Sequence, residues 1–267
     1  MQYYQPEYWE PPGNFLEKAG RQTLLLLRDS GRALLILAEA FACLKDAPRR
    51  HREVFRQMCN CGIRSLGVTS MVALFTGMIL SLQAGLILRM YGQEVQVGTL
   101  VSQSMVREMG PFMTALILAA SVGSAIAAEL GTMQVSNEIA AMHVMSVNPA
   151  SFLVMPRLIG FMVMCPVLTV YTNVLGVTGG MLVANTQLGV SPSAYYDNAI
   201  QFLGNKEVYV GLFKAWVFSL IIVAVACYQG LTTANGAVGV GRATRATVVH
   251  SFLLVLVSGY IITRIFY

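Results

Sequence analysis

Five long runs of apolar residues dominate the chain, and short polar segments separate them. A helix needs about 20 apolar residues to cross the hydrocarbon core of a bilayer, and each run is about that length or longer. The runs are Leu66–Leu88, Leu100–Leu130, Phe152–Val183, Val210–Gln229 and Val248–Phe266. This pattern predicts an all-α, polytopic membrane protein with five transmembrane helices, the second of them kinked at Pro111.

The segment before the first run predicts a helix of another kind. Residues 15–44 contain no proline, and five of their charged side chains fall on one narrow stripe of an otherwise largely apolar helix. The stripe consists of Glu17, Arg21, Arg28, Arg32 and Glu39. Such a helix lies in the membrane interface. We therefore expect residues 1–62 to form a tail, an interfacial amphipathic helix and a basic linker, and residues 63–267 to form the transmembrane domain.

A mildly polar segment between the second and third runs predicts a short helix outside the membrane. Thr132–Val147 contains neither glycine nor proline, and Asn148-Pro149 ends it. Its candidate apolar anchors are Met133, Ile139, Met142 and Met145. The pattern fits a plain connecting helix and a helix docked on a partner equally well.

Composition and charge support the membrane assignment. The 267 residues are 55% apolar and 12% charged, whereas soluble domains carry roughly 25% charged residues. Much of the net charge of +5 comes from a basic cluster just before the first run. Its members are Lys45, Arg49, Arg50, Arg52, Arg56 and Arg64. The positive-inside rule puts this cluster, and with it the N-terminus, in the cytoplasm. Five spans then place the C-terminus on the opposite side, and nucleic-acid binding is a poor explanation of the cluster.

Charged side chains inside the apolar runs are the best candidates for function. Glu108 lies in the second run, and a carboxylate there survives only if it faces a cavity, a partner or the bundle interior. Arg107 adjoins it, Lys214 lies near the outer start of the fourth run, and Gln83 lies in the first run. Glu108 and Lys214 either flank the headgroup of an amphiphile or form an ion pair that locks two spans together.

Motifs for catalysis and for metal or nucleotide binding are absent from the sequence. The five cysteines and three histidines show no zinc or disulfide spacing, and no G-x-x-x-x-G-K-[ST] loop is present. We expect no enzyme activity, no metal and no cofactor in this chain. Any ATP-driven step then needs a partner that binds ATP and magnesium.

Several motifs together resemble the MlaE family of permeases. They are Arg107-Glu108-Met109-Gly110-Pro111, the run Gly123–Met133 (GSAIAAELGTM), Met155-Pro156-Arg157, and the run Gly239–Val249 (GVGRATRATVV). The resemblance extends over about residues 67–267. It implies a permease subunit of an ABC transporter that moves phospholipids between an inner membrane and a periplasmic MCE-protein channel. This transport would maintain the lipid asymmetry of the outer membrane.

The resemblance also implies partners and residue roles. The implied partners are a second copy of the permease, two cytosolic ABC ATPase subunits, a hexameric periplasmic MCE-domain protein and the phospholipid itself. The resemblance further implies that residues 63–267 form the permease domain and that this domain lies in a bacterial inner membrane. The positions that match the family's lipid site are Gln83, Tyr91, Arg107, Glu108 and Lys214, with Leu80, Leu82 and Leu88 against acyl chains. Residues 132–147 match the helix that couples to the ATPase, through Met133, Glu138, Ile139, Met142 and Met145.

Three positions depart from the family pattern. Ser121 replaces a frequent arginine, Ala140 replaces a frequent aspartate, and Asn148-Pro149 replaces an Asp-Pro step. The Ser121 change is expected to remove an ion pair with Glu129. Two other functions remain open from the residues alone: an ion-driven secondary transporter with Glu108 as proton carrier, and a membrane scaffold for a cytosolic partner.

Overall fold

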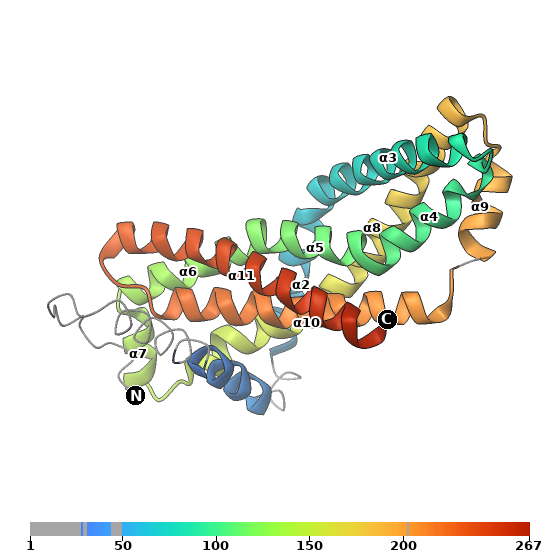
Figure 1. Cartoon of the computed structure of the whole chain (residues 1–267). Helices are drawn as coiled ribbons and strands as arrows, with labels where there is room; N and C mark the ends of the chain where they lie inside the picture. The colour runs from blue at the N-terminus through green and yellow to red at the C-terminus, as the bar shows by residue number, and fades with distance from the viewer. Residues whose placement is uncertain (1–27, 29–30, 44–49, 202) are drawn as a thin grey trace, which may run out of the picture.

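The computed structural model describes residues 28, 31–43, 50–201 and 203–267, and this part of the chain is all-helical (Figure 1). Five of its helices are long and apolar enough to cross a membrane. They span His51–Met90, Glu94–Val135, Ala150–Leu188, Asn205–Leu231 and Gly236–Phe266. Each encloses one predicted run, so the fold class and the five-span prediction are confirmed.

The first two long helices change their hydrogen-bonding pattern along their length. The first consists of α2 (His51–Gly62), the 3₁₀ turn η2 (Ile63–Ser65) and α3 (Leu66–Met90). The second consists of η3 (Glu94–Gln96), α4 (Val97–Ser104), η4 (Met105–Met109), α5 (Gly110–Leu118), η5 (Ala119–Gly123) and α6 (Ser124–Val135). Both η4 and η5 are π turns, which widen a helix locally and are frequent at functional sites.

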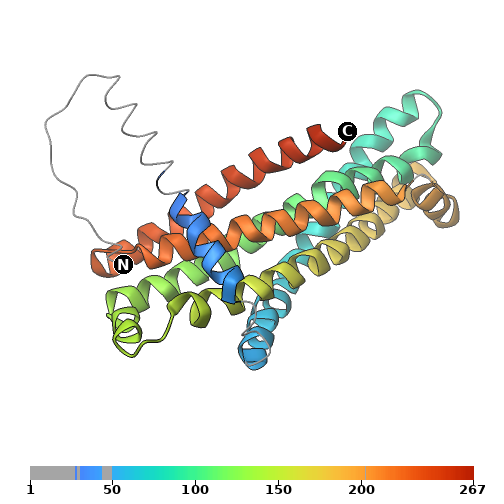
Figure 2. The same cartoon turned by 90° about the horizontal axis from the view of Figure 1, so that it is seen from below.

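The remaining elements complete the bundle. They are α7 (Glu138–Val144), the π turn η6 (Ala150–Val154), α8 (Met155–Leu188), α9 (Pro192–Gln201), α10 (Asn205–Leu231) and α11 (Gly236–Phe266). In Figures 1 and 2, α3 runs along α8 at one end of the molecule, while α6, α10 and α11 lie together at the other. The apolar windows of α8 and α10 are 61% and 67% buried, against 22% and 28% for the first long helix and α11. The first long helix and α11 therefore present the widest exposed apolar faces.

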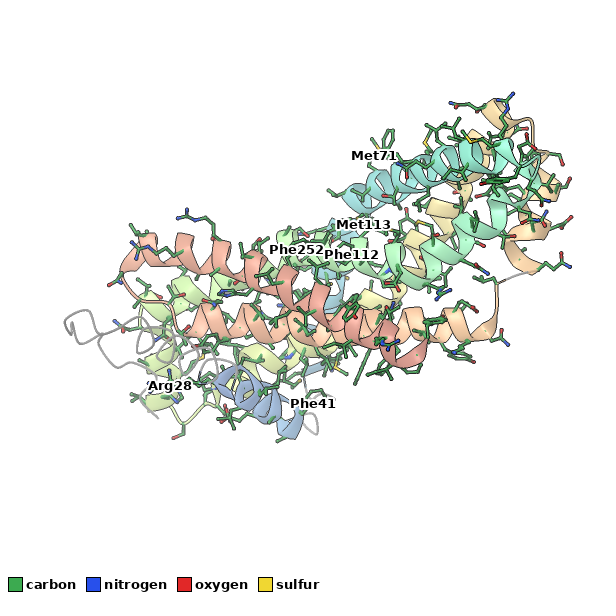
Figure 3. All side chains as sticks on the ribbon, viewed as in Figure 1. Arg28, Phe41, Met71, Phe112, Met113 and Phe252 are labelled. Carbon is green, nitrogen blue, oxygen red and sulfur yellow. The ribbon has the colours of Figure 1, made fainter. Side chains whose placement is uncertain are left out.

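Two apolar clusters hold the bundle together. The larger joins α5, α6, α8 and α10 through side chains such as Phe161 and Phe218. The smaller gathers Val97, Val101 and Tyr195 where α4 meets α9. The Phe112 and Phe252 rings, labelled in Figure 3, tie α5 to α11 with their centroids 6.2 Å apart.

Helix α9 is anchored to α8 by one buried tyrosine. The Tyr195 hydroxyl donates a hydrogen bond to the Val177 carbonyl at 3.2 Å. Burial, and secondarily the neighbouring Tyr196, raises the pKa of this phenol above its usual value. The hydroxyl therefore stays protonated and keeps donating this bond at physiological pH.

The helix predicted over residues 132–147 is two elements in the structure. Helix α6 continues to Val135, and Asn137 then takes a left-handed conformation with φ of 61° before α7 begins at Glu138. Asparagine tolerates this conformation because its short polar side chain bonds locally. The sequence around Asn137 contains neither glycine nor proline and is typical of a helix, so the break at this residue was not predicted.

The predicted interfacial helix is described in its second half, where residues 31–42 are helical. Ile36 and Ala40 are buried against the larger cluster, whereas Leu34 and Leu35 are exposed. Figures 1 and 2 place this helix beside α10. Of the charged stripe, Glu17 and Arg21 lie outside the described residues.

Candidate functional site

Pro111 creates an unsatisfied acceptor in the middle of the second long helix. Proline has no N–H, so the carbonyl four residues earlier loses its helical donor, and that carbonyl belongs to Arg107. The helix accommodates the proline by forming η4 directly before α5, in which Pro111 occupies the first turn. At Pro111, where a kink was predicted, the structure has a π turn, and the Arg107 carbonyl lacks its α-helical donor.

Lys214 of α10 satisfies this carbonyl. Its Nζ donates to Arg107 O at 2.8 Å, to Glu108 Oε1 at 2.6 Å and to Thr263 Oγ1 at 2.7 Å. An ammonium group has three N–H donors, so all of them are used. Lys214 is 1% exposed and Glu108 is 41% exposed. The structure thus joins Glu108 and Lys214 as an ion pair whose cation has no donor left for a ligand.

Thr263 of α11 completes the arrangement. Its hydroxyl lies 2.8 Å from Glu108 Oε1 and 2.8 Å from the Gly259 carbonyl, either of which accepts its one hydrogen. Glu108 Oε2 has no hydrogen-bond or ion-pair partner among the described residues, and it remains the oxygen of the pair that is free to meet a ligand. Three helices, α5 with its preceding turn, α10 and α11, therefore meet at one buried ammonium.

Arg107 carries the positive charge that this network leaves over. Its guanidinium carbon lies 3.7 Å from the centre of the Tyr267 ring, and Lys206 Nζ lies 5.0 Å from the same ring. Stacking on an aromatic face holds a guanidinium without using its N–H donors. Arg107 makes no ion pair with any residue that the structure describes, so its fork of donors remains available.

A glycine allows α10 to approach close enough for Lys214 to reach. A Cβ at Gly211 would collide with the Val106 carbonyl oxygen of η4. One turn later in α10, Lys214 enters the space beside Glu108. The close contact of α10 with η4 thus depends on the missing side chain at this position.

Substituting Gly211 with valine is expected to push α10 away from η4 and break the Lys214 hydrogen bonds. Overpacking of this kind costs about 1–3 kcal/mol. Thermal unfolding of the purified protein in detergent measures the loss. Gly241→Val on α11 is the matched control, because no atom lies within 4 Å of a Cβ there. Equal melting temperatures for the two variants would contradict this packing role.

The other predicted lipid contacts lie on α3 or, for Tyr91, directly after its end, and they are not part of the charged network. Gln83 and Tyr91 are exposed, and within the described residues neither hydrogen-bonds to Glu108 or Lys214. Leu80 and Leu88 are partly buried against the smaller cluster. Leu82 is likewise half-buried.

Two members of the network were not predicted from the sequence. Thr263 and Tyr267 lie one turn apart near the end of α11, opposite Glu108 and Arg107. The only signal for them is the isolated threonine in a strongly apolar run.

The predicted ATPase-coupling residues divide into buried and exposed groups. Ile139 is 6% exposed, and Met133 and Met142 pack partly buried on the larger cluster. Glu138 and Met145 face outward, the latter 66% exposed. The segment therefore uses three of its five predicted residues to hold itself against the bundle and leaves two for a partner.

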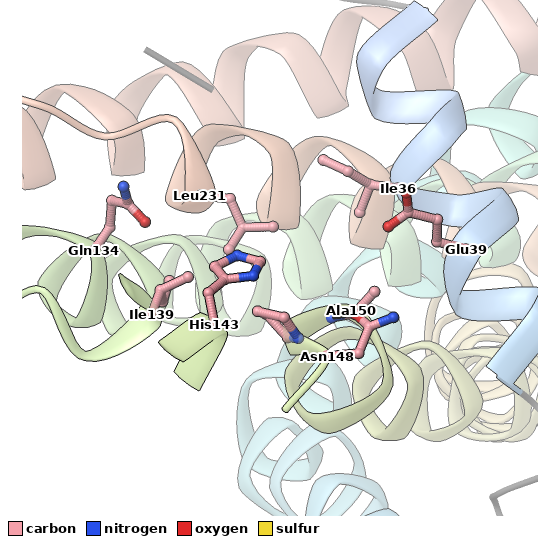
Figure 4. Close-up of a pocket in the computed structure, with 9 residues that line it drawn as sticks. Ile36, Glu39, Gln134, Ile139, His143, Asn148, Ala150 and Leu231 are labelled. Carbon is pink, nitrogen blue, oxygen red and sulfur yellow. Dashed lines mark hydrogen bonds between the residues drawn. The ribbon is translucent and has the colours of Figure 1, made fainter. Parts of the chain in front are cut away.

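A small cavity lies between this segment and the N-terminal helix. It measures about 60 Å³, and Figure 4 shows His143 of α7 reaching into it, with Ile36 and Glu39 on the N-terminal helix and Leu231 on α10. The interfacial helix and α7 therefore meet at the same end of the bundle.

Glu129 retains an ion pair despite Ser121. Its Oε2 lies 2.8 Å from a guanidinium nitrogen of Arg157, which is 3% exposed and also donates to the Leu153 carbonyl at 2.8 Å. Ser121 itself bonds only to its own helix at the Ile117 carbonyl, and Glu129 takes its cation from α8 instead.

Comparison with known proteins agrees with this architecture. The sequence model of the family described as permease MlaE matches residues 54–265. A probable ABC transporter permease of Rickettsia conorii is 35% identical over 254 residues, which cover 95% of this chain and 98% of the relative.

Two further relatives carry names that refer to lipids. The intermembrane phospholipid transport system permease protein MlaE of Haemophilus influenzae is 30% identical over 257 residues, covering 95% of this chain and 98% of the relative. The chloroplastic protein TRIGALACTOSYLDIACYLGLYCEROL 1 of Arabidopsis thaliana is 31% identical over 216 residues, covering 81% of this chain and 62% of the relative. With a family match over most of its length and relatives that align nearly end to end, this chain belongs to the MlaE family of ABC transporter permeases.

Proposed function

We propose that this chain is the membrane-spanning subunit of an ABC transporter that moves phospholipids between a bacterial inner membrane and a periplasmic MCE-domain channel. In this proposal it forms a homodimer, its N-terminus is cytoplasmic and its C-terminus periplasmic. Two cytosolic ATPases dock at α7 and hydrolyse ATP, and transport maintains the lipid asymmetry of the outer membrane. Family membership and the name of the Haemophilus relative, a phospholipid transport permease, support this assignment.

The main support for a phospholipid substrate is the positive charge of Arg107, which no described residue neutralises. Lys214 and Glu108 neutralise each other, so the cluster of these three side chains has a net charge of +1. A phosphodiester carries one negative charge, and a guanidinium binds phosphate through two parallel hydrogen bonds. Arg107 is therefore the group that binds the lipid phosphate in this proposal, while Lys214 positions Glu108 and the helix backbone.

The acyl chains have apolar surface nearby. The exposed side of α3 carries Met71, Phe75 and Ile79, and that of α11 carries Leu253 and Val257. These are the two spans with the least burial inside the chain. A two-chained lipid held at Arg107 can lie along either face, or between the faces of two protomers.

Arg107→Gln is the variant that tests this assignment. Loss of a charge-assisted hydrogen bond costs about 1.5–3 kcal/mol, so bound phospholipid per protomer is expected to fall at least about tenfold. Mass spectrometry of lipids that remain on the purified transporter measures the change. Arg264→Gln, an exposed α11 arginine outside the network, is the control. Retention of the full lipid complement in Arg107→Gln would exclude Arg107 as the phosphate ligand.

Neither alternative gains support from the structure. A proton carrier must become neutral in each cycle, whereas protonation of Glu108 would leave the ammonium group of Lys214 buried without its counter-charge. A pure scaffold has no use for an unpaired arginine beside a buried ion pair. We therefore retain the phospholipid permease as the proposed function.

A further inference from the structure

A second polar cleft lies far along the second long helix from Arg107. It encloses about 260 Å³ between α2–η2 on one side and η5–α6 on the other. Helix α2 packs on α8, whereas η5 and α6 pack on α10 and α11. The two walls therefore belong to different parts of the bundle, and the cleft between them is open.

The two walls differ in chemistry. Asn60, Gln57 and Arg64 provide amide and guanidinium donors on the first wall. On the second wall, the half-buried Val122 and the exposed Ala125 form an apolar strip that ends at Glu129, and Ile126 lies buried behind them. The small side chain of Ser121 bonds to its own helix at the Ile117 carbonyl, which leaves the space in front of it clear.

Charge in the cleft is not balanced. The Glu129 carboxylate is already paired with Arg157, which is buried behind it. Arg64 is exposed and makes no ion pair with any described residue. The sum over Arg64, Arg157 and Glu129 is +1, which one phosphodiester would neutralise.

The cleft also lies at the level of a membrane surface. Arg64 lies in η2, which directly precedes α3, and Glu129 lies near the end of the second long helix. The neighbouring basic residues Arg50, Arg52 and Arg56 mark this end as the cytoplasmic one in the proposed orientation. A polar wall beside an apolar strip at this depth matches a lipid headgroup with its chains.

We propose that this cleft binds one phospholipid of the cytoplasmic leaflet. The phosphate lies on Arg64 with Asn60 and Gln57 as hydrogen-bond donors, and the chains follow Val122 and Ala125. This site is separate from Arg107 and goes beyond the proposed function, because it gives the permease a lipid contact at each membrane surface. The leaflet assignment rests on the proposed orientation, whereas the binding of a phosphate-bearing lipid does not.

Lipid counting separates this site from the one at Arg107. The assembled transporter is stripped of lipid, incubated with vesicles of phosphatidylethanolamine and phosphatidylglycerol, and analysed by native mass spectrometry. Arg64→Gln removes the charge, and Ser121→Trp fills the cleft. Both are expected to weaken binding of one lipid per protomer at least about tenfold, while Arg56→Gln, a basic neighbour outside the lining, keeps it.

Each outcome has a distinct meaning. A wild-type lipid count in both Arg64→Gln and Ser121→Trp overturns the inference. Full competition by millimolar inorganic phosphate overturns a lipid occupant in favour of a free anion. A disulfide between two copies of Ser121→Cys, with no lipid lost in Arg64→Gln, shows instead that a second protomer covers the cleft. Loss of lipid in Arg64→Gln but none in Arg107→Gln supports this site and contradicts only the assignment of Arg107 as the phosphate ligand of the proposed function.

Discussion

Lys214→Met is expected to lower the free energy of unfolding by about 2–4 kcal/mol. This loss is smaller than the loss of one partner from a fully buried ion pair, because Glu108 is partly exposed. The variant removes all three donors that hold Arg107 O, Glu108 and Thr263. It leaves a carboxylate inside an apolar span and a carbonyl that Pro111 cannot satisfy. Thermal unfolding in detergent, together with retention of the assembled complex, measures the effect.

A double variant separates stability from function. Glu108→Gln combined with Lys214→Met removes both charges, so stability is expected to recover toward wild type relative to Lys214→Met alone. Lipid transport is expected to remain impaired, because the group beside Arg107 is altered. Lys206→Met, which removes an exposed α10 lysine near Tyr267, is the matched control. If Lys214→Met melts like Lys206→Met, the ion pair has no structural role.

Met145→Glu is expected to uncouple ATP hydrolysis from lipid transport by a large factor. Met145 is exposed beyond the end of α7, so a charge there disturbs a docking surface without disturbing the core. Met142 is a poorer choice, because it packs on the larger cluster and its substitution also affects folding. The measurement is the ratio of lipid transported to ATP hydrolysed in reconstituted vesicles.

Val95→Glu provides the control for this experiment. Val95 is also an exposed apolar residue, but it lies in η3 at the opposite end of the second long helix. The account predicts a normal transport ratio for Val95→Glu and a reduced ratio for Met145→Glu. A normal ratio in both would mean that α7 does not transmit the ATPase cycle.

The sequence was sufficient for the spans because bilayer thickness imposes a length and a composition that any helix must meet. All five runs lie inside long helices of the structure. Glu108 and Lys214 were also identifiable, because charged residues in apolar runs are costly and need a partner. Their pairing was one of two open interpretations, and spacing alone could not choose between them.

Other features depend on contacts between distant segments. Thr263 joins the network only because α11 packs beside α5 and α10, which no local pattern encodes. Arg157 pairs with Glu129 across two helices, a contact that was not predicted from the sequence. The left-handed Asn137 interrupts a segment whose composition suits one continuous helix. Such features need the tertiary structure because their energies come from packing, not from propensity.

The proposed permease function can be tested by purifying the tagged chain from its native host in mild detergent. Mass spectrometry then identifies the proteins and lipids that co-purify with it. We expect an ABC ATPase, an MCE-domain protein and bound phospholipid, with the phospholipid reduced in Arg107→Gln. Recovery of the chain with neither an ATPase nor a phospholipid would contradict it.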